Sequence, residues 1–225
     1  NLQNFNTENV LNMSSMFAEC KRLSSIDLSN FNTKNVLNMN NMFEDCKNLF
    51  KIDLSNFNTK NVLNMNSMFE DCKNLFKIDL SNFNTENVIN MNSMFYGTKI
   101  EKINISNFNT KNVTDMGNMF SKCNNLINID LSNLNVQNVI DFGGMFSNCY
   151  NLKNIKLCKF NGQKIINLSY MFNKCRELIN IDLSNIRTKN DVDMSGMFNE
   201  CYKLKNINLS NSYFKIYEMN ELFKD

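Results

Sequence analysis

The sequence predicts an α/β repeat solenoid in which each turn contributes one short parallel strand and one short helix or 3₁₀ segment. Three markers recur together at a spacing of 26 residues, with a single step of 25: a leading apolar residue, a Met–Phe pair and a Cys, which is replaced by Thr98 in the short copy. A strict period of roughly 20 to 50 residues is the signature of solenoids, propellers and arrays. The leading apolar residues are Phe5, Phe31, Phe57, Phe83, Phe108, Leu134, Phe160 and Ile186.

The first predicted element of each turn is a short strand, exemplified by "LSSIDLSN" from Leu23 to Asn30. Ile26 and Leu28 would face inward, and Asp27 would face outward, because side chains alternate along a strand. The spacing L-x-x-I-x-L is also the strand signature of leucine-rich repeats, although Asn30 lies one position before the usual asparagine of that motif. A propeller blade would need about 40 residues or more, so this repeat is too short for one.

The second predicted element follows the Asn-rich turn "NFNTKN", where Asn tolerates left-handed backbone. The next apolar residues are spaced 3, 3, 1, 3 and 3 apart, which favours a short helix or 3₁₀ turns with one apolar face. In the second copy they are Val36, Met39, Met42, Phe43, Cys46 and Leu49. One unit cannot bury this face alone, so stacked units must form a continuous core. We expect a solenoid of about eight repeats over residues 1–211, starting within a repeat, and a degenerate capping repeat over 212–225.

The chain has 8 Cys and no His. Seven Cys lie in the repeat column, on the predicted inner face, where Cys behaves as a small hydrophobe. We expect buried free thiols; disulfides between neighbouring turns are the alternative, although parallel side chains would not face one another. A zinc site would need converging Cys pairs, and a catalytic Cys would need a His. The column consists of Cys20, Cys46, Cys72, Cys123, Cys149, Cys175 and Cys201.

Cys158 lies outside this column, at the position of the strand serine. We expect its side chain to point outward, where Lys156 and Lys159 would lower its pKa. The thiol would then be reactive, unless Cys158 is simply a drifted serine.

Composition excludes several function classes. The net charge is +2, and Lys alternates with Asp and Glu, which argues against nucleic-acid binding. No apolar run approaches about 18 residues, so no transmembrane segment is expected. The Met columns are typical of adaptable core packing rather than of thioether metal ligation. No catalytic motif, cofactor site or metal site is recognisable, so we expect neither an enzyme nor a cofactor.

The outward strand face is the place where binding of a partner protein is expected, as on the sheets of other solenoids. Its central column is mainly Asp, with about 4.8 Å between neighbours in a parallel stack. Lys two residues earlier would relieve the repulsion within that column. A solvated, charge-balanced surface is the alternative, and calcium binding is disfavoured because the loop pattern of calcium sites is missing. The candidate partner-binding residues are Lys51, Asp53, Ser55, Lys77, Asp79, Ser81, Lys102, Asn104, Asp130, Lys156, Cys158 and Asp182.

A rank of Thr residues follows the strand, and it breaks at Val136 and Gly162. Regular Thr ranks on flat solenoids can order water, so ice binding is conceivable. Side-chain hydrogen bonds that close the turn fit the Asn-rich context better. The rank comprises Thr7, Thr33, Thr59, Thr85, Thr110 and Thr188.

The complete repeat, F-N-T-x-N-V-x-N-M-x-x-M-F-x-x-C-x-x-L-x-x-I-D-L-S-N, resembles that of the BspA-type leucine-rich-repeat surface proteins. The resemblance covers about Leu2 to Leu209. It implies a cell-surface or secreted location, adhesion or binding to a host or matrix protein, and no enzymatic activity. A structural spacer, whose length matters more than its face, is the alternative. We expect a monomer.

Overall fold

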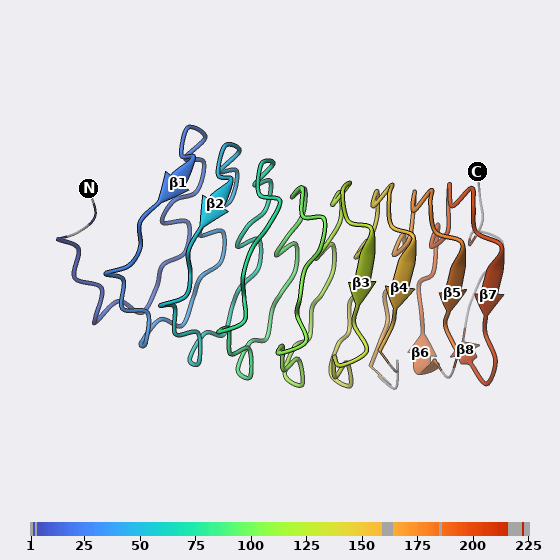
Figure 1. Cartoon of the computed structure of the whole chain (residues 1–225). Helices are drawn as coiled ribbons and strands as arrows, with labels where there is room; N and C mark the ends of the chain where they lie inside the picture. The colour runs from blue at the N-terminus through green and yellow to red at the C-terminus, as the bar shows by residue number, and fades with distance from the viewer. Residues whose placement is uncertain (1, 3, 159–163, 185, 216–221, 223–225) are drawn as a thin grey trace.

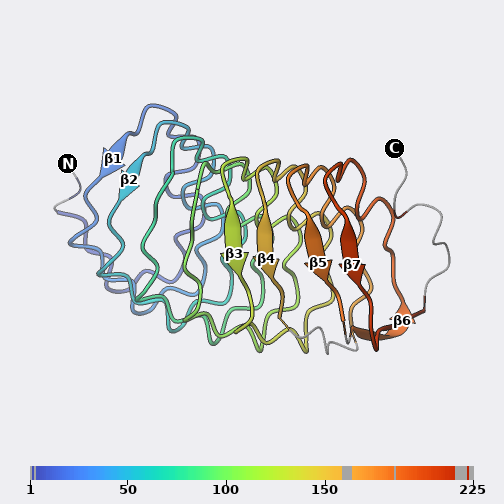
Figure 2. The same cartoon turned by 45° about the vertical axis from the view of Figure 1, so that its right-hand side comes forward.

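The computed structural model describes residues 2, 4–158, 164–184, 186–215 and 222. In these ranges the chain winds as coils stacked along one axis, and the colours in Figure 1 pass from coil to coil in sequence order. Figure 2 shows the same succession from a second direction. Each coil therefore packs mainly against the coils before and after it, as in other solenoids.

Short parallel strands lie at equivalent positions of successive coils. Ile129 pairs with Ile155, and Ile181 pairs with Ile207, one repeat apart in each case. The sheets are pairs, β1–β2, β3–β4, β5–β7 and β6–β8, so the parallel strand of the prediction is confirmed. The strands are β1 (Ser25–Ile26), β2 (Lys51–Ile52), β3 (Asn128–Asp130), β4 (Asn154–Lys156), β5 (Asn180–Asp182), β6 (Arg187–Asp191), β7 (Asn206–Asn208) and β8 (Tyr213–Lys215).

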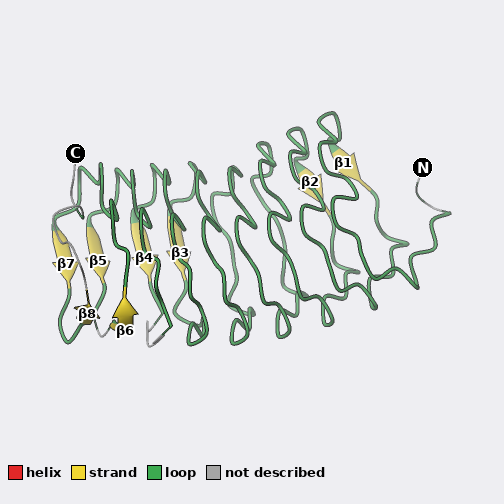
Figure 3. Cartoon of the chain, turned by 180° about the vertical axis from the view of Figure 1, so that it is seen from behind, coloured by secondary structure: helices red, strands yellow, loops and turns green. Residues whose placement is uncertain are grey.

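The predicted helix or 3₁₀ segment is wrong: the described residues contain strands and loops only (Figure 3). The Met–Phe–Cys segment instead forms successive β-turns. In the second copy, Met42 N–H donates to the Met39 carbonyl, and Cys46 N–H donates to the Phe43 carbonyl. The third residue of each turn is left-handed, with φ of 56° at Asn41 and 54° at Asp45. Left-handed residues four positions apart interrupt an α-helix. The consecutive turns nevertheless place residues three apart, such as Met39 and Met42, on the same side of the chain.

Hydrogen bonds between coils explain why this turn arrangement is stable. The N–H groups of Met39, Asn41, Phe43 and Asp45 donate to carbonyls of the next coil, at residues 64, 66, 68 and 70. Alternate N–H groups thus point along the solenoid axis, as in a strand, and are unavailable for a helix. We call residues 36–49 and their equivalents the turn side of the coil.

A column of bridges runs along the turn side from Asn12 to Asp193. Each of its side chains also caps its own turn: for example, the Asn38 Oδ1 accepts a hydrogen bond from Asn40 N–H at 3.1 Å. Asx side chains favour such local bonds. This function accounts for part of the high Asn content. The column is Asn12, Asn38, Asn64, Asn90, Asp115, Asp141, Asn167 and Asp193.

The core is dominated by one stack of Phe rings, one from each coil. Successive ring centroids lie 5.4–5.8 Å apart, and the ring planes differ by 3–12°. Most of these rings, and the Met side chains around them, are fully buried, as the sequence predicts. The stack runs through Phe17, Phe43, Phe69, Phe95, Phe120, Phe146, Phe172 and Phe198.

The Cys column lies beside this stack, and its predicted burial is confirmed for the inner coils. Cys20 in the first coil is exposed, and Cys201 is half-buried. From Cys46 onward, each thiol donates a hydrogen bond to the Phe carbonyl of the preceding coil, at 3.0–3.2 Å. Burial raises the pKa of these thiols, to about 12 at Cys123. The column is therefore a set of neutral thiols that also connects coils.

Asn and Thr side chains connect the coils at the turn after the strand. The Asn56 amide donates to the carbonyls of Leu28 and Phe31 in the preceding coil, at 2.9 and 3.0 Å. An asparagine ladder therefore exists, one position earlier than in the usual leucine-rich motif. The Thr33 hydroxyl accepts a bond from Asn58 N–H at 2.8 Å and donates to the Asn58 carbonyl at 3.1 Å. The Thr rank thus bonds between coils, rather than within a turn as predicted.

The last described residues pack on the end of the stack. β8 pairs with β6 in parallel, with an irregular register, and Phe198 N–H donates to the Leu222 carbonyl at 3.0 Å. Leu222 itself is buried. The remainder of the predicted capping repeat, residues 216–221 and 223–225, lies outside the described residues.

Candidate interaction face

The outward side chains of the strand segments form one continuous surface, which we call the strand face. Its columns begin at residues 24, 25, 27 and 29 and repeat in each coil. Eleven of the twelve candidate residues are exposed on it; Cys158 is the exception. The fold therefore brings together side chains that lie far apart in the sequence.

The Asp column is organised by local turns. Asp27 Oδ1 accepts a hydrogen bond from Ser29 N–H at 3.0 Å, and Asp53 does the same with Ser55 at 2.9 Å. Because these bonds favour the ionised form, they lower the pKa of Asp27, Asp53 and Asp79. The carboxylates are consequently charged at neutral pH. The hydroxyl and N–H of Ser132, together with Lys156, lower the pKa of Asp130 to about 2.

The predicted charge relief by Lys differs between the two halves of the face. Lys156 forms an ion pair with Asp130 across coils at 3.1 Å. In contrast, Lys51 and Lys77 form no ion pair with the described residues, although both stand two residues before an Asp. These Lys and Asp charges are left to solvent or to a partner.

The prediction for Cys158 is wrong. Its side chain is only 6% exposed, and burial raises the pKa of the thiol to about 12. The neighbouring Leu157 is half-buried, although its equivalents Leu131 and Leu183 are fully buried. The strand serine is usually exposed because it remains hydrated, whereas a thiol is apolar enough to pack inward. Cys158 is therefore neither a reactive thiol nor part of the exposed face.

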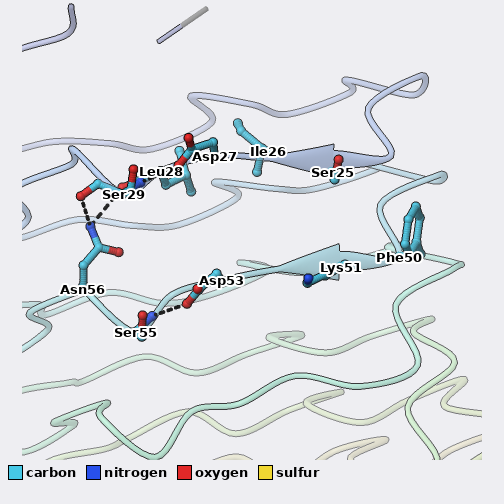
Figure 4. A pocket seen from close by; sticks show the side chains of 10 residues that line it. All are labelled: Ser25, Ile26, Asp27, Leu28, Ser29, Phe50, Lys51, Asp53, Ser55 and Asn56. Atoms are coloured by element: carbon cyan, nitrogen blue, oxygen red, sulfur yellow. Dashed lines mark hydrogen bonds between the residues drawn. The ribbon is translucent and has the colours of Figure 1, made fainter. Parts of the chain in front are cut away.

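Hollows lie along the strand face, between neighbouring coils. The one between β1 and β2 has a volume of about 440 Å³ and is shown in Figure 4. It is lined by the apolar side chains of Ile26 and Leu28 and by the charged residues Asp27, Lys51 and Asp53. A second hollow of about 550 Å³ lies beside Lys77, Asp79 and Lys102.

Two members of this face were missed by the sequence analysis. Phe50 and Phe76 are 48% and 53% exposed and directly precede Lys51 and Lys77. They contribute to the walls of the hollows. The sequence contained a signal for the exposure of these two rings. The equivalent position in the first coil is Ser24, so packing does not require a large apolar side chain there.

The described residues contain no cluster of three or more His, Cys, Asp or Glu side chains arranged to hold a metal ion. The Asp column is spread over successive coils rather than converging on one point. Its geometry suits contacts with an extended surface.

A protein-family model matches residues 1–106, 74–177 and 98–212; its description is "Mycoplasma protein of unknown function, DUF285". The chain belongs to this family. The matches overlap and together extend over nearly all of the coils, as expected when a family is defined by a tandem repeat. No curated protein matches this DUF285 chain.

Some solved structures of leucine-rich-repeat proteins are similar to this chain. The DUF285 chain is similar to a leucine-rich repeat protein from Bacteroides ovatus, with 15% identity, a TM-score of 0.42, and coverage of 93% of this chain and 68% of that one. It is similar to a leucine rich cell surface protein from Faecalibacterium prausnitzii, with 17% identity, a TM-score of 0.31, and coverage of 94% and 79%.

A third similarity is to the functional domain of InlJ from Listeria monocytogenes, described as including a cysteine ladder. The identity is 15%, the TM-score is 0.28, and the match covers 89% of this chain but only 44% of that one.

Among the described residues of the DUF285 chain, no helix is long and apolar enough to span a membrane.

Proposed function

We propose that the chain is a non-enzymatic protein-interaction module that binds a partner protein through its strand face, at a cell surface or after secretion. The observation that carries this proposal is the combination of hollows and unpaired charges on that face. The core beneath it is fixed by the Phe stack and by bonds between coils, so the exposed side chains are held in a regular array. Preorganised surfaces of this kind lose little conformational entropy on binding.

The test compares the parent chain with a variant in which the strand face is neutralised: Lys51→Ser, Asp53→Asn, Lys77→Ser and Asp79→Asn. Both proteins are immobilised and presented with a panel of purified extracellular matrix and cell-surface proteins. We expect the parent to bind at least one of them, and the variant to lose that binding while keeping the parent's unfolding midpoint. Equal binding by the parent, by this variant and by a counterpart carrying Asp130→Asn and Lys156→Ser would contradict the proposal.

A structural spacer is the second candidate, and the regularity of the Phe stack favours it. In that function the number of coils matters and the strand face does not. The same neutralised variant separates the two candidates, because a spacer would retain its function with all four charges removed. Deleting one complete repeat, Phe57–Asn82, would instead impair the spacer.

A further inference from the structure

We propose that the N-terminal half of the strand face, comprising the coils of Asp27, Asp53, Asp79 and Asn104, binds an extended polypeptide segment in which acidic and basic side chains alternate. This inference rests on the proposed function and specifies its partner. The segment would lie parallel to a strand, so that an acidic side chain lies over one Lys of the rank Lys51, Lys77 and Lys102. The basic side chain two residues away would lie over the Asp of the same coil, as at Lys51 with Asp53 or at Lys77 with Asp79.

The first argument is charge. The two ranks carry opposite signs and run side by side across successive coils. No ion pair joins them within the described part of the chain, although nine ion pairs form elsewhere in it. A uniformly acidic or basic partner would satisfy one rank and be repelled by the other. A partner carrying both signs in register satisfies both.

The second argument is spacing. Lys51 and Asp53 are two residues apart on one strand, so their side chains leave the same face about 7 Å apart. The side chains at i and i+2 of an extended segment have this same separation. A segment lying parallel to a strand can therefore place an acidic group on a Lys and a basic group on an Asp. The next coil, 5.4–5.8 Å away at the Phe stack, presents a Lys and an Asp with the same separation.

The third argument is the shape of the surface. Residues 77–80 form no backbone hydrogen bond with residues 51–54 among the described residues, and the hollows lie between these coils. The half-exposed rings of Phe50 and Phe76 stand at the side of the hollows next to the Lys rank. Apolar side chains of the bound segment could pack against these rings. The ion pairs between the segment and the Lys and Asp side chains would then be partly shielded from water.

The C-terminal half of the same face also has a hollow, of about 360 Å³ beside Asp130 and Lys156, and half-exposed apolar side chains at Ile127 and Ile179, but its polar groups are already bonded. The Asn154 amide donates to Asn128 Oδ1, and the Asn206 amide donates to Asn180 Oδ1, each at 2.7 Å. Lys156 is already paired with Asp130. The polar groups of this half thus bond to one another from coil to coil. A partner would have to break these bonds, so the difference between the halves predicts where binding occurs.

The experiment uses three fluorescent peptides of equal length and the intact chain. The first peptide alternates Glu and Arg at every second position, with Thr between them. The second has the same composition, with the Glu residues at one end, the Arg residues at the other and all the Thr residues between them, and the third replaces every charge with Gln. We expect the alternating peptide to bind about tenfold or more tightly than the other two, in fluorescence anisotropy at low ionic strength. Equal binding of all three would overturn the inference.

Two matched variants localise the site. The N-terminal variant carries Lys51→Ser, Asp53→Asn, Lys77→Ser and Asp79→Asn. The C-terminal variant carries Asn128→Ser, Asp130→Asn, Asn154→Ser and Lys156→Ser. All eight side chains are exposed, so both variants should fold, as circular dichroism will check. We expect the N-terminal variant to lose the preference for the alternating peptide and the C-terminal variant to keep it.

The opposite pattern, in which only the C-terminal variant loses binding, would overturn the inference and leave the proposed function intact. Protein partners that bind the parent and both variants equally would overturn the proposed function itself.

Discussion

The turn side of each coil and its strand face connect neighbouring coils in different ways. On the turn side, four backbone N–H groups of one coil donate to the next, and a Phe ring and a thiol add further contacts. On the strand face, paired strands are two or three residues long, and the coils of Lys51 and Lys77 are not joined by a strand pair. The turn side therefore holds the stack together, and the strand face contributes fewer bonds between coils.

The largest expected effect comes from removing an aromatic ring. Two variants of the same coil are compared, one without a ring on the turn side and one without a ring on the strand face. Phe69 is fully buried in the stack, so Phe69→Ala should lower the free energy of unfolding by about 3–5 kcal/mol. Phe76 is 53% exposed, so Phe76→Ala should change the free energy of unfolding by no more than about 0.5 kcal/mol. Urea unfolding of the two variants measures both values. Similar losses would mean that the strand face also holds the stack.

The thiols of the turn side make stability sensitive to alkaline pH. A folded-state pKa that is raised favours the folded protein below the unfolded pKa of about 8.5, and this contribution is lost as pH rises. At about pH 10, each fully buried thiol should therefore reduce the free energy of unfolding by about 2 kcal/mol relative to about pH 8. The measurement is the urea midpoint at the two pH values.

Thr98 supplies the control, because it occupies the Cys column and donates to the Phe95 carbonyl at 2.9 Å without titrating. Cys72→Thr should lose less stability than the parent between the two pH values, by the contribution of one thiol. Identical losses in parent and variant would show that Cys72 ionises equally well in both states.

A smaller test compares two buried Thr of one rank. The Thr59 hydroxyl donates to Asn84 and accepts from it, whereas that of Thr188 has no hydrogen-bond partner among the described residues. Thr59→Val should therefore lower the free energy of unfolding by about 1 kcal/mol. Thr188→Val should be neutral or slightly stabilising, because it removes a buried polar group without a partner. Equal losses in thermal unfolding would contradict a role for the Thr bonds between coils.

Much of this fold was predictable from the repeat. The columns of Ile26, Leu28, Phe43 and Cys46 identify the inward side chains, and the period requires stacking. The helix was not distinguishable from consecutive turns, because both place residues three apart on one side. The deciding factor is that N–H groups such as those of Asn41 and Phe43 bond to the next coil, and a pattern of apolar residues does not report that.

The candidate face was predictable where the repeat is regular. The exposure of Lys51, Asp53, Lys77 and Asp79 follows from alternation along the strand. The prediction for Cys158 was wrong because a Cys in place of the usual strand serine is buried. One substitution at a regular position thus changed which side chain packs inward. The absence of Lys–Asp ion pairs in one half could not be inferred either, since residues two apart on a strand share a face without necessarily touching.

The smallest expected effect concerns acid and the strand face itself. The pKa of Asp130 is lowered to about 2, so its contribution to stability is present above the ordinary Asp value and is lost as pH falls toward about 2. Because the carboxylate is half exposed, salt should weaken the effect further. Asp130→Asn keeps an acceptor for Ser132 N–H, as Asn104 does for Ser106, but it does not titrate. Between about pH 5 and pH 2, the parent should therefore lose slightly more stability than this variant in thermal unfolding. A difference as large as that caused by Phe69→Ala would show that the strand face contributes to stacking, and the division between the two sides of the coil would be wrong.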